Sequence, residues 1–294
     1  MLRNSLLDRK VGLALGSGAA RGLAHIGVLE ILEKEDIPID MIAGTSMGAI
    51  IGAMYTQGKN AAEIKKVALD LGWRKLARMF ALTSPRAGFL SGRKIRSHLQ
   101  EIIGEVDFTD LRIPFACVAT DIVTGEEVVI QEGPVLEAVI ASMSLPVIFK
   151  VAEQHGRYLV DGGVVNPVPV SVLKDMSADF IIASNVIVKP VDRVRNTQTE
   201  AEVQKNTAKT EAPNIFNIMT QLVNITSYQT VKSSLSGADI VIGPNVADIG
   251  FADFKNAREC IHQGELAAQA SMPEIKRLMA VDFSLNQIFT VQRA

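Results

Sequence analysis

Two strand, turn and helix units follow one another at the start of the chain, and they restrict the fold more than any other feature. An apolar run at Val11–Leu15 leads into a glycine-rich turn, Gly16–Gly22, and then into helical spacing. A second apolar run at Asp40–Ala43 leads into the turn Gly44–Gly48 and a further helical segment. Successive units of this kind build a parallel sheet with helices on its faces. We therefore predict an α/β fold with a mostly parallel central sheet.

The remainder of the chain contains further candidate strands. Ile113–Thr120 and Glu127–Gln131 flank a Thr-Gly turn and are predicted to form a hairpin. Later strands are expected at Tyr158–Val160, Asp179–Val188 and Ala238–Ile242. We expect about five or six strands in the sheet.

We interpret residues 1–294 as one domain. Its motifs fall within a core at about residues 11–188. Residues 190–213 are polar, offer almost no apolar anchor and are predicted to be a mobile loop. Residues 214–294 are expected to form a C-terminal, mainly helical part.

Composition excludes several classes of protein. The chain is 48% hydrophobic and 21% charged, which excludes a disordered protein. Its formal net charge of −2 gives no reason to expect a nucleic acid partner. The two cysteines, Cys117 and Cys260, lie at no zinc-ligand spacing, and no acidic cluster has EF-hand spacing. We expect neither a metal nor a cofactor.

The sequence also bears on the compartment. Residues 1–10 contain no apolar signal-peptide segment, so we expect a cytoplasmic protein. The uncharged run Met41–Gly58 has 18 residues, near the lower limit for a membrane span. Because Gly44 and several polar residues interrupt this run, we interpret it as a strand followed by a helix.

The pentapeptide Gly44-Thr45-Ser46-Met47-Gly48 fits the pattern G-x-S-x-G between a strand and a helix. In that setting a sharp turn presents the serine hydroxyl at a helix N-terminus, and the two glycines prevent backbone collisions. Ser46 is therefore a candidate nucleophile. The alternative is a buried glycine-rich turn with an inert serine.

The turn Gly16-Ser17-Gly18-Ala19-Ala20-Arg21-Gly22 also follows a strand and opens a helix. Its backbone N–H groups can converge on a negative oxygen, either a dinucleotide pyrophosphate or the oxyanion of an attacked ester. Its spacing is G-x-G-x-x-x-G, one residue longer than the dinucleotide fingerprint.

A serine nucleophile needs a base, and four histidines are available. His25, His98 and His262 lie in helical segments; we expect His25 to have a packing or capping role and the other two to lie at the surface. His155, in a polar turn, is an alternative base. The better candidate is Asp161, because Gly162 and Gly163 permit a tight turn that aims its carboxylate into a cleft.

Together these motifs resemble the patatin-like phospholipase family, including its bacterial serine hydrolases. The resemblance covers about Val11–Val188: an oxyanion loop at Gly16–Gly22, a G-x-S-x-G elbow at Gly44–Gly48, a small-residue segment at Ala141–Pro146 and a D-G-G turn at Asp161–Gly163. The family implies a three-layer α/β/α fold.

The resemblance also assigns roles to residues. It implies that Ser46 is the nucleophile and Asp161 its base, and that the backbone at Gly16, Ser17 and Gly18 forms the oxyanion hole. Arg21 would hold the loop or an anionic headgroup, and the remaining motif glycines, Gly22, Gly44, Gly48, Gly162 and Gly163, would shape the turns. Ser17 replaces a glycine of the plant pattern, which is harmless if its φ is negative.

We therefore expect a serine esterase or lipid acyl hydrolase of phospholipase A or lysophospholipase type, acting on a lipid or acyl ester. A thioesterase or acyltransferase could use the same dyad. A non-catalytic adaptor, and more remotely a dinucleotide-binding oxidoreductase, remain alternatives. The sequence leaves chain length, headgroup and oligomeric state open.

One segment, Lys59–Arg96, is strongly basic. It contains ten lysines and arginines against Glu63 and Asp70, a balance of 10 − 2 = +8, with aromatic and aliphatic residues among them. This mixture suits peripheral contact with an anionic membrane, and the alternative is a helical cap with a solvated basic face.

Overall fold

The computed structural model describes residues 9–70, 88–145, 151–189 and 215–291. In these ranges eight strands form one mixed sheet in the order β5, β6, β3, β2, β1, β7, β8, and β4 pairs with β3. The strands are β1 (Val11–Leu15), β2 (Met41–Thr45), β3 (Phe115–Asp121), β4 (Glu127–Ile130), β5 (Ala152–Gln154), β6 (Arg157–Asp161), β7 (Phe180–Ser184) and β8 (Ile240–Ile242). The pairs among β3, β2, β1, β7 and β8 are parallel, whereas β4, β6 and β5 pair antiparallel. The mostly parallel sheet is as predicted.

The sheet has more strands than the five or six predicted. The sequence gives no sign of β5, because Glu153–Gly156 looks like a polar turn. In the structure β5 and β6 form a hairpin whose turn residues, His155 and Gly156, both have positive φ, at 50° and 75°. The predicted strand Asp179–Val188 is also shorter, since β7 ends at Ser184.

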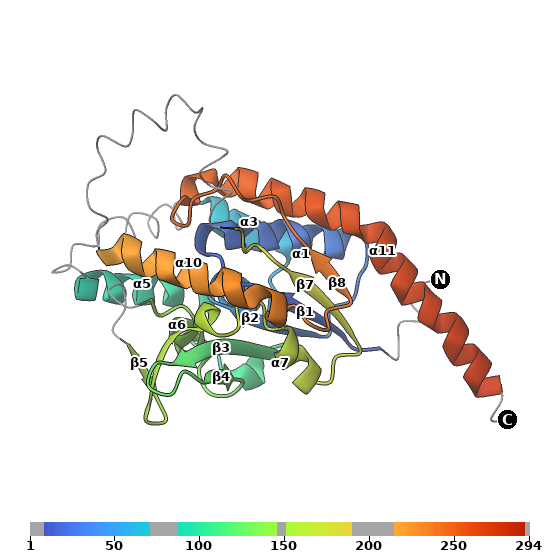
Figure 1. Cartoon of the computed structure of the whole chain (residues 1–294), viewed down its shortest axis with the longest axis horizontal. Coiled ribbons are helices and arrows are strands. Elements are labelled where there is room, and N and C mark those ends of the chain that lie inside the picture. The colour runs from blue at the N-terminus through green and yellow to red at the C-terminus, as the bar shows by residue number, and fades with distance from the viewer. Residues whose placement is uncertain (1–8, 71–87, 146–150, 190–214, 292–294) are drawn as a thin grey trace.

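Helices cover both faces of the sheet, which confirms the three-layer α/β/α arrangement. In β1, Leu13 and Leu15 pack into one hydrophobic cluster and Ala14 into the other, as the two-residue period of a strand requires. Figure 1 shows α1, α3 and α11 layered together beside the sheet. The helices are α1 (Ala24–Lys34), α2 (Met47–Thr56), α3 (Ala61–Leu69), α5 (Gly88–Ile103), α6 (Val135–Ser142), α7 (Val170–Asp175), α10 (Ile215–Ser234) and α11 (Ala257–Val291).

Two glycines let α1 and α11 lie very close together. A Cβ atom on Gly27 would lie 2.0 Å from the carbonyl oxygen of Ile261, and one on Gly264 would lie 1.9 Å from that of Ala24. Neither contact tolerates a side chain. Helix α11 begins at Ala257, after a short 3-10 turn, η5 (Phe254–Asn256).

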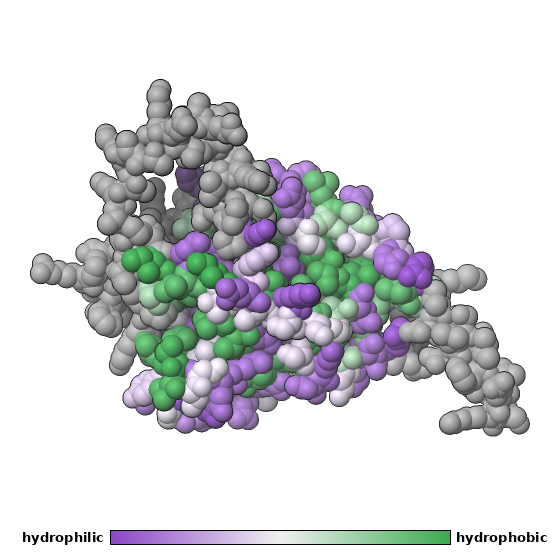
Figure 2. Space-filling model, viewed as in Figure 1, coloured by the Kyte–Doolittle hydropathy of each residue, from purple (hydrophilic) through white to green (hydrophobic). Residues whose placement is uncertain are grey.

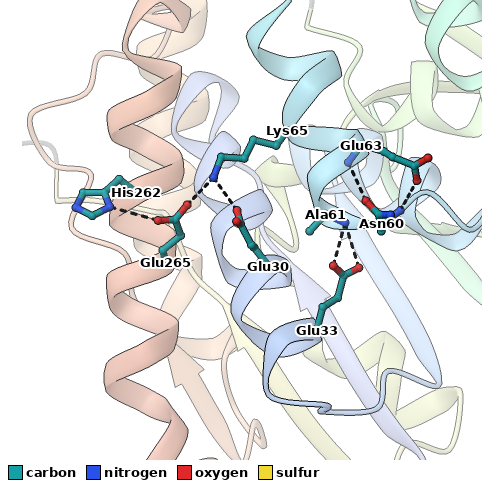
Figure 3. Close-up of polar contacts among 8 residues, drawn as sticks. All are labelled: Glu30, Glu33, Asn60, Ala61, Glu63, Lys65, His262 and Glu265. Atoms are coloured by element: carbon teal, nitrogen blue, oxygen red, sulfur yellow. Dashed lines mark hydrogen bonds and ion pairs between the residues drawn. The ribbon is translucent and has the colours of Figure 1, made fainter.

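Polar side chains join the outer surfaces of the same helices (Figure 3). Lys65 of α3 lies between Glu30 of α1 and Glu265 of α11, with Nζ 2.8 Å from a carboxylate oxygen of each. Nearby, the Glu33 carboxylate accepts from the Ala61 N–H at the N-terminus of α3, 3.1 Å away. These contacts orient α3 against its neighbours.

Within the described ranges, no helix combines the length and the apolar character that crossing a bilayer requires. The uncharged run at 41–58 forms β2 and α2, as predicted. Residues 71–87 of the basic segment Lys59–Arg96, and the predicted loop at 190–213, lie outside the described residues.

Candidate active site

Ser46 occupies a sharp turn between β2 and α2. Its φ of 56° and ψ of −115° are unfavourable for a residue with a side chain, and the surrounding contacts hold this conformation in place. The Ser46 N–H donates to Ser142 Oγ over 2.9 Å, and the Ser46 carbonyl accepts from the first turn of α2. A Cβ on Gly48 would lie 2.1 Å from the Leu15 carbonyl oxygen, and one on Gly44 would lie 2.7 Å from the Ala49 backbone. The turn therefore requires glycine at both positions.

The pairing of β3 brings Asp161 to Ser46. Thr45, which precedes Ser46, pairs with Val118, and Asp161 pairs with Ala119, the next residue of β3. Because β4 pairs with both portions of β3, β2 and β6 must lie in succession along its other edge. The register therefore juxtaposes two residues that are 115 positions apart in the sequence.

The two side chains form a direct hydrogen bond. Ser46 Oγ donates to Asp161 Oδ2 over 2.7 Å, and the Gly163 N–H donates to Asp161 Oδ1 over 2.8 Å. Asp161 is only 2% exposed, and this burial raises the pKa of its carboxyl to about 6, although the two hydrogen bonds act in the opposite direction. A carboxylate with this pKa is a stronger base than an exposed aspartate.

The turn after Asp161 requires its two glycines. A Cβ on Gly162 would lie 2.2 Å from the Val118 carbonyl oxygen, and one on Gly163 would lie 2.8 Å from Ser17 Oγ. The Gly163 carbonyl accepts from Ser227 Oγ of α10 over 2.6 Å. Contacts with the sheet, with the Gly16–Gly22 loop and with α10 therefore hold the turn in position.

Two of the three N–H groups predicted to form the oxyanion hole, those of Gly16 and Ser17, have backbone partners. The Gly16 N–H donates to the Ser184 carbonyl over 3.1 Å, and the Ser17 N–H donates to the Pro167 carbonyl over 2.8 Å, so both are already used. Among the described residues, neither the Gly18 nor the Ala19 N–H has such a partner. Two adjacent donors therefore remain. A dinucleotide-binding turn presents several successive backbone N–H groups to the pyrophosphate, whereas this loop has only the two of Gly18 and Ala19 without a backbone partner among the described residues.

The sequence analysis requires a negative φ at Ser17, where a serine replaces a glycine of the plant pattern. The described residues with positive φ include Ala19 but not Ser17, so a serine is tolerated at this position.

Arg21 holds the loop from inside the protein. Its side chain is buried, at 1% exposure; Nε donates to the Ile249 carbonyl over 2.8 Å, and Nη1 donates to Asn224 Oδ1 over 3.2 Å. This burial excludes the alternative in which Arg21 meets a headgroup. Gly22 lets the loop approach α2, because a Cβ there would lie 2.4 Å from Met47 Cγ.

The histidines lie away from this dyad or have other partners. His25 Nε2 must donate to the Gly16 carbonyl, because a carbonyl oxygen only accepts. In the neutral ring Nδ1 then accepts from Ser184 Oγ over 2.7 Å. Burial lowers the pKa of His25 to about 4, so the ring is neutral and supports the loop. His155 is exposed at the β5–β6 turn. His262 is exposed as predicted, whereas His98 is buried in α5, because the face it shares with Ile95 packs inward.

An apolar pocket opens beside the serine. The empty space in and around it, including open solvent at its mouth, is about 390 Å³. The residues that line the pocket are Ala19, Ser46, Met47, Ile50, Met143, Leu145, Phe251, Ala252 and Phe254. Such a lining accepts a hydrocarbon chain.

Sequence reasoning missed the supporting residues of this site. The small-residue segment at 141–146 pointed to the right region, but nothing indicated that Ser142 Oγ accepts from the nucleophile's own N–H. No signal pointed to Phe251 or Phe254, which follow β8. In the described part of the chain, no group of three or more His, Cys, Asp or Glu side chains could hold a metal ion.

The chain is similar to several known proteins. An uncharacterized NTE family protein of Mycobacterium tuberculosis is 39% identical over 174 residues, covering 59% of this chain and 48% of that protein. Lysophospholipase NTE1 of Meyerozyma guilliermondii is 34% identical over 191 residues, covering 63% of this chain and 12% of that protein. The crystal structure of VipD from Legionella pneumophila matches with a TM-score of 0.49 and 14% identity, over 90% of this chain and 67% of VipD. The chain thus spans about half the length, 48%, of the mycobacterial relative.

A family model described as patatin-like phospholipase matches residues 13–174. This match covers more than half of the chain and includes the elbow at Ser46, the glycine-rich loop and the turn at Asp161. The chain belongs to the patatin-like phospholipase family.

Proposed function

We propose that this protein is a serine esterase that hydrolyses acyl esters of lipids, of phospholipase A or lysophospholipase type. The observation that carries the proposal is the 2.7 Å hydrogen bond from Ser46 Oγ to a buried carboxylate, at a strained elbow beside an apolar pocket. The names of the matched family and of the yeast relative, a lysophospholipase, support the substrate class.

The mechanism follows from the positions of these groups. Ser46 Oγ attacks the ester carbonyl carbon while its proton passes to Asp161 Oδ2. The carbonyl oxygen becomes negative and accepts from the N–H groups of Gly18 and Ala19. When the carbon–oxygen bond breaks, the leaving alkoxide takes the proton from Asp161, and an acyl-enzyme remains.

Water completes the cycle. It attacks the acyl carbon, gives a proton to Asp161 and releases the fatty acid; Ser46 Oγ leaves with that proton. Because the dyad has no imidazole, the barrier must be lowered largely by the two backbone donors and by the raised pKa of Asp161. If an alcohol replaces water in the second step, the same dyad transfers the acyl group.

Hydrolysis of p-nitrophenyl acyl esters tests this proposal. We expect Ser46→Ala and Asp161→Asn each to lower kcat/KM by about 10³-fold or more, because nucleophile and base act as a unit. Matched controls are Ser233→Ala and Asp175→Asn, which change exposed helical residues and should leave activity unchanged. Folded dyad variants with wild-type activity would refute the proposal.

We further propose that the enzyme meets its lipid at a membrane surface. Lys65, in the described part of the basic segment, is paired with two carboxylates. The support for a membrane contact comes instead from α10. On the inner face of α10, Asn224 and Ser227 hydrogen-bond to Arg21 and Gly163, and Val223 packs into the core, whereas Ile218, Leu222 and Ile225 are exposed. Figure 2 shows hydrophobic residues at the surface over this helix. The sequence of α10 has no carboxylate and one lysine, which suits an anionic surface.

Sedimentation with vesicles of phosphatidylcholine and phosphatidylglycerol tests this contact. We expect the double variant Leu222→Asp and Ile225→Asp to lower the bound fraction at least fivefold, because each change places a charge in the apolar contact. Gln229→Asp, on the same exposed face, is the control for added charge alone. Equal binding by the double variant and the control would exclude α10 as the contact.

A further inference from the structure

One wall of the pocket comes from residues outside the family match. Phe251, Ala252 and Phe254 line the pocket together with Ser46 and Met47, yet the family match ends at residue 174. They lie in the connection from β8 to α11, which we call the 249–254 segment. Phe254 is 4% exposed and packs into the core, whereas Ala252 is exposed. Phe254 therefore bounds the inner side of the pocket and Ala252 lies nearer its mouth.

Hydrogen bonds fix this segment to the loop that carries the two free N–H groups. The Ala20 N–H donates to the Phe251 carbonyl over 3.0 Å, one residue after Ala19. On the other side of Phe251, the Ile249 carbonyl accepts from Arg21 Nε over 2.8 Å. Cys260 Sγ, in the first turns of α11, contacts the Arg21 carbonyl oxygen at 3.0 Å. The segment thus has a fixed position relative to the loop.

A wall fixed in this way limits what can lie beside the serine. We expect an acyl chain attached to the reacting carbonyl to lie in this pocket, because Ser46 lines it and most of its other lining residues are apolar. Of the two phenylalanines that line the pocket, Phe254 is the more deeply buried, at 4% exposure. A rigid aromatic side chain at that depth stops a longer chain, since the packed core behind it cannot move aside.

We propose that the 249–254 segment determines the acyl-chain length that the enzyme accepts, with Phe254 as the inner limit and Ala252 as the constriction at the mouth. This inference rests on the proposed esterase function. It predicts that selectivity resides in the C-terminal part of the chain, while the dyad resides in the matched part.

Two variants that change the pocket in opposite directions test the proposal. Phe254→Ala removes the inner limit, and we expect the ratio of kcat/KM for decanoyl over butyryl p-nitrophenyl esters to rise about tenfold. Ala252→Phe narrows the mouth at an exposed position that tolerates folding, and we expect the same ratio to fall at least fivefold. Controls are Phe108→Ala, which removes a ring outside the pocket, and Ala270→Phe, which adds one to an exposed face of α11.

A second readout separates this proposal from the proposed function. The shift in Tm caused by saturated fatty acids of 4 to about 16 carbons reports chain-length preference without turnover. If no ester is hydrolysed but the preferred fatty acid changes in the two variants as expected, the esterase proposal fails and the wall is supported. If the ratio and the preferred fatty acid stay at the wild-type values in both variants, the 249–254 segment does not determine chain length.

Discussion

Asp161 combines two opposing influences at the scale of a single residue. Burial disfavours its charge, while Ser46 Oγ and the Gly163 N–H each favour it by donating a hydrogen bond. Burial has the larger effect, so the pKa rises to about 6. A carboxyl group with this value is charged at neutral pH and still accepts a proton more readily than an exposed aspartate.

The pH dependence of activity should report this residue. The base must be deprotonated, so kcat/KM should fall about tenfold per pH unit below pH 6 and reach a plateau above about pH 7. Rates measured from pH 4 to 9 with a short acyl ester check this, with circular dichroism as a control for folding. An acidic limb near pH 4, the ordinary value for a carboxyl, would mean that Asp161 is not the base.

The sequence was informative about the dyad because each residue belongs to a local motif. Ser46 and Asp161 lie in turns whose glycines are required by close backbone approaches, and those requirements are visible as G-x-S-x-G and D-G-G. The local motifs do not indicate which N–H groups of the Gly16–Gly22 loop remain without a backbone partner. The Gly16 and Ser17 donors are used by Ser184 and Pro167, residues more than a hundred positions away.

At the scale of elements, we expect the close packing of helices to contribute more to the free energy of unfolding than surface charge does. Alanine normally stabilises a helix by about 1 kcal/mol relative to glycine. Gly264→Ala should nevertheless lower the free energy of unfolding by about 1–3 kcal/mol, because the new Cβ would lie 1.9 Å from the Ala24 carbonyl oxygen. Lys65→Met should cost less than about 1 kcal/mol, since its ion pairs are partly exposed.

Urea denaturation measures both changes. Gly243→Ala is the matched control, because a Cβ there meets nothing within 4 Å. If Gly264→Ala were as stable as the control, α1 and α11 would not pack as closely as the structure places them. If Lys65→Met cost more than Gly264→Ala, the charged network would be the more important contact.

Some strands can be predicted from the sequence and others cannot. The strands β1 and β2 are apolar runs bounded by glycine-rich turns, so their positions follow from the pattern. Strand β5 has three residues and a polar sequence, and it exists only because β6 pairs with it. The sequence likewise predicts His98 at the surface, although it is buried. Its burial depends on residues that pack against α5 from distant parts of the chain.

At the scale of the whole molecule, the site depends on long-range contacts around a locally defined dyad. The matched region provides Ser46, Asp161 and the loop, while α10 and the 249–254 segment hold the D-G-G turn and Arg21 from outside it. We therefore expect the C-terminal part to be necessary for activity as well as for stability. This assembly also accounts for the limits of the sequence analysis, since contacts between distant segments have no local signature.

The central claim is that Ser46 is the nucleophile and that Asp161 activates it. Labelling with an alkyl fluorophosphonate, followed by mass spectrometry of the intact protein and of its peptides, tests this most directly, because only an activated serine forms the adduct. We predict one adduct per chain, located on Ser46, absent in Ser46→Ala and formed at least a hundredfold more slowly in Asp161→Asn. An adduct on another residue, or an equal labelling rate in folded Asp161→Asn, would contradict the account.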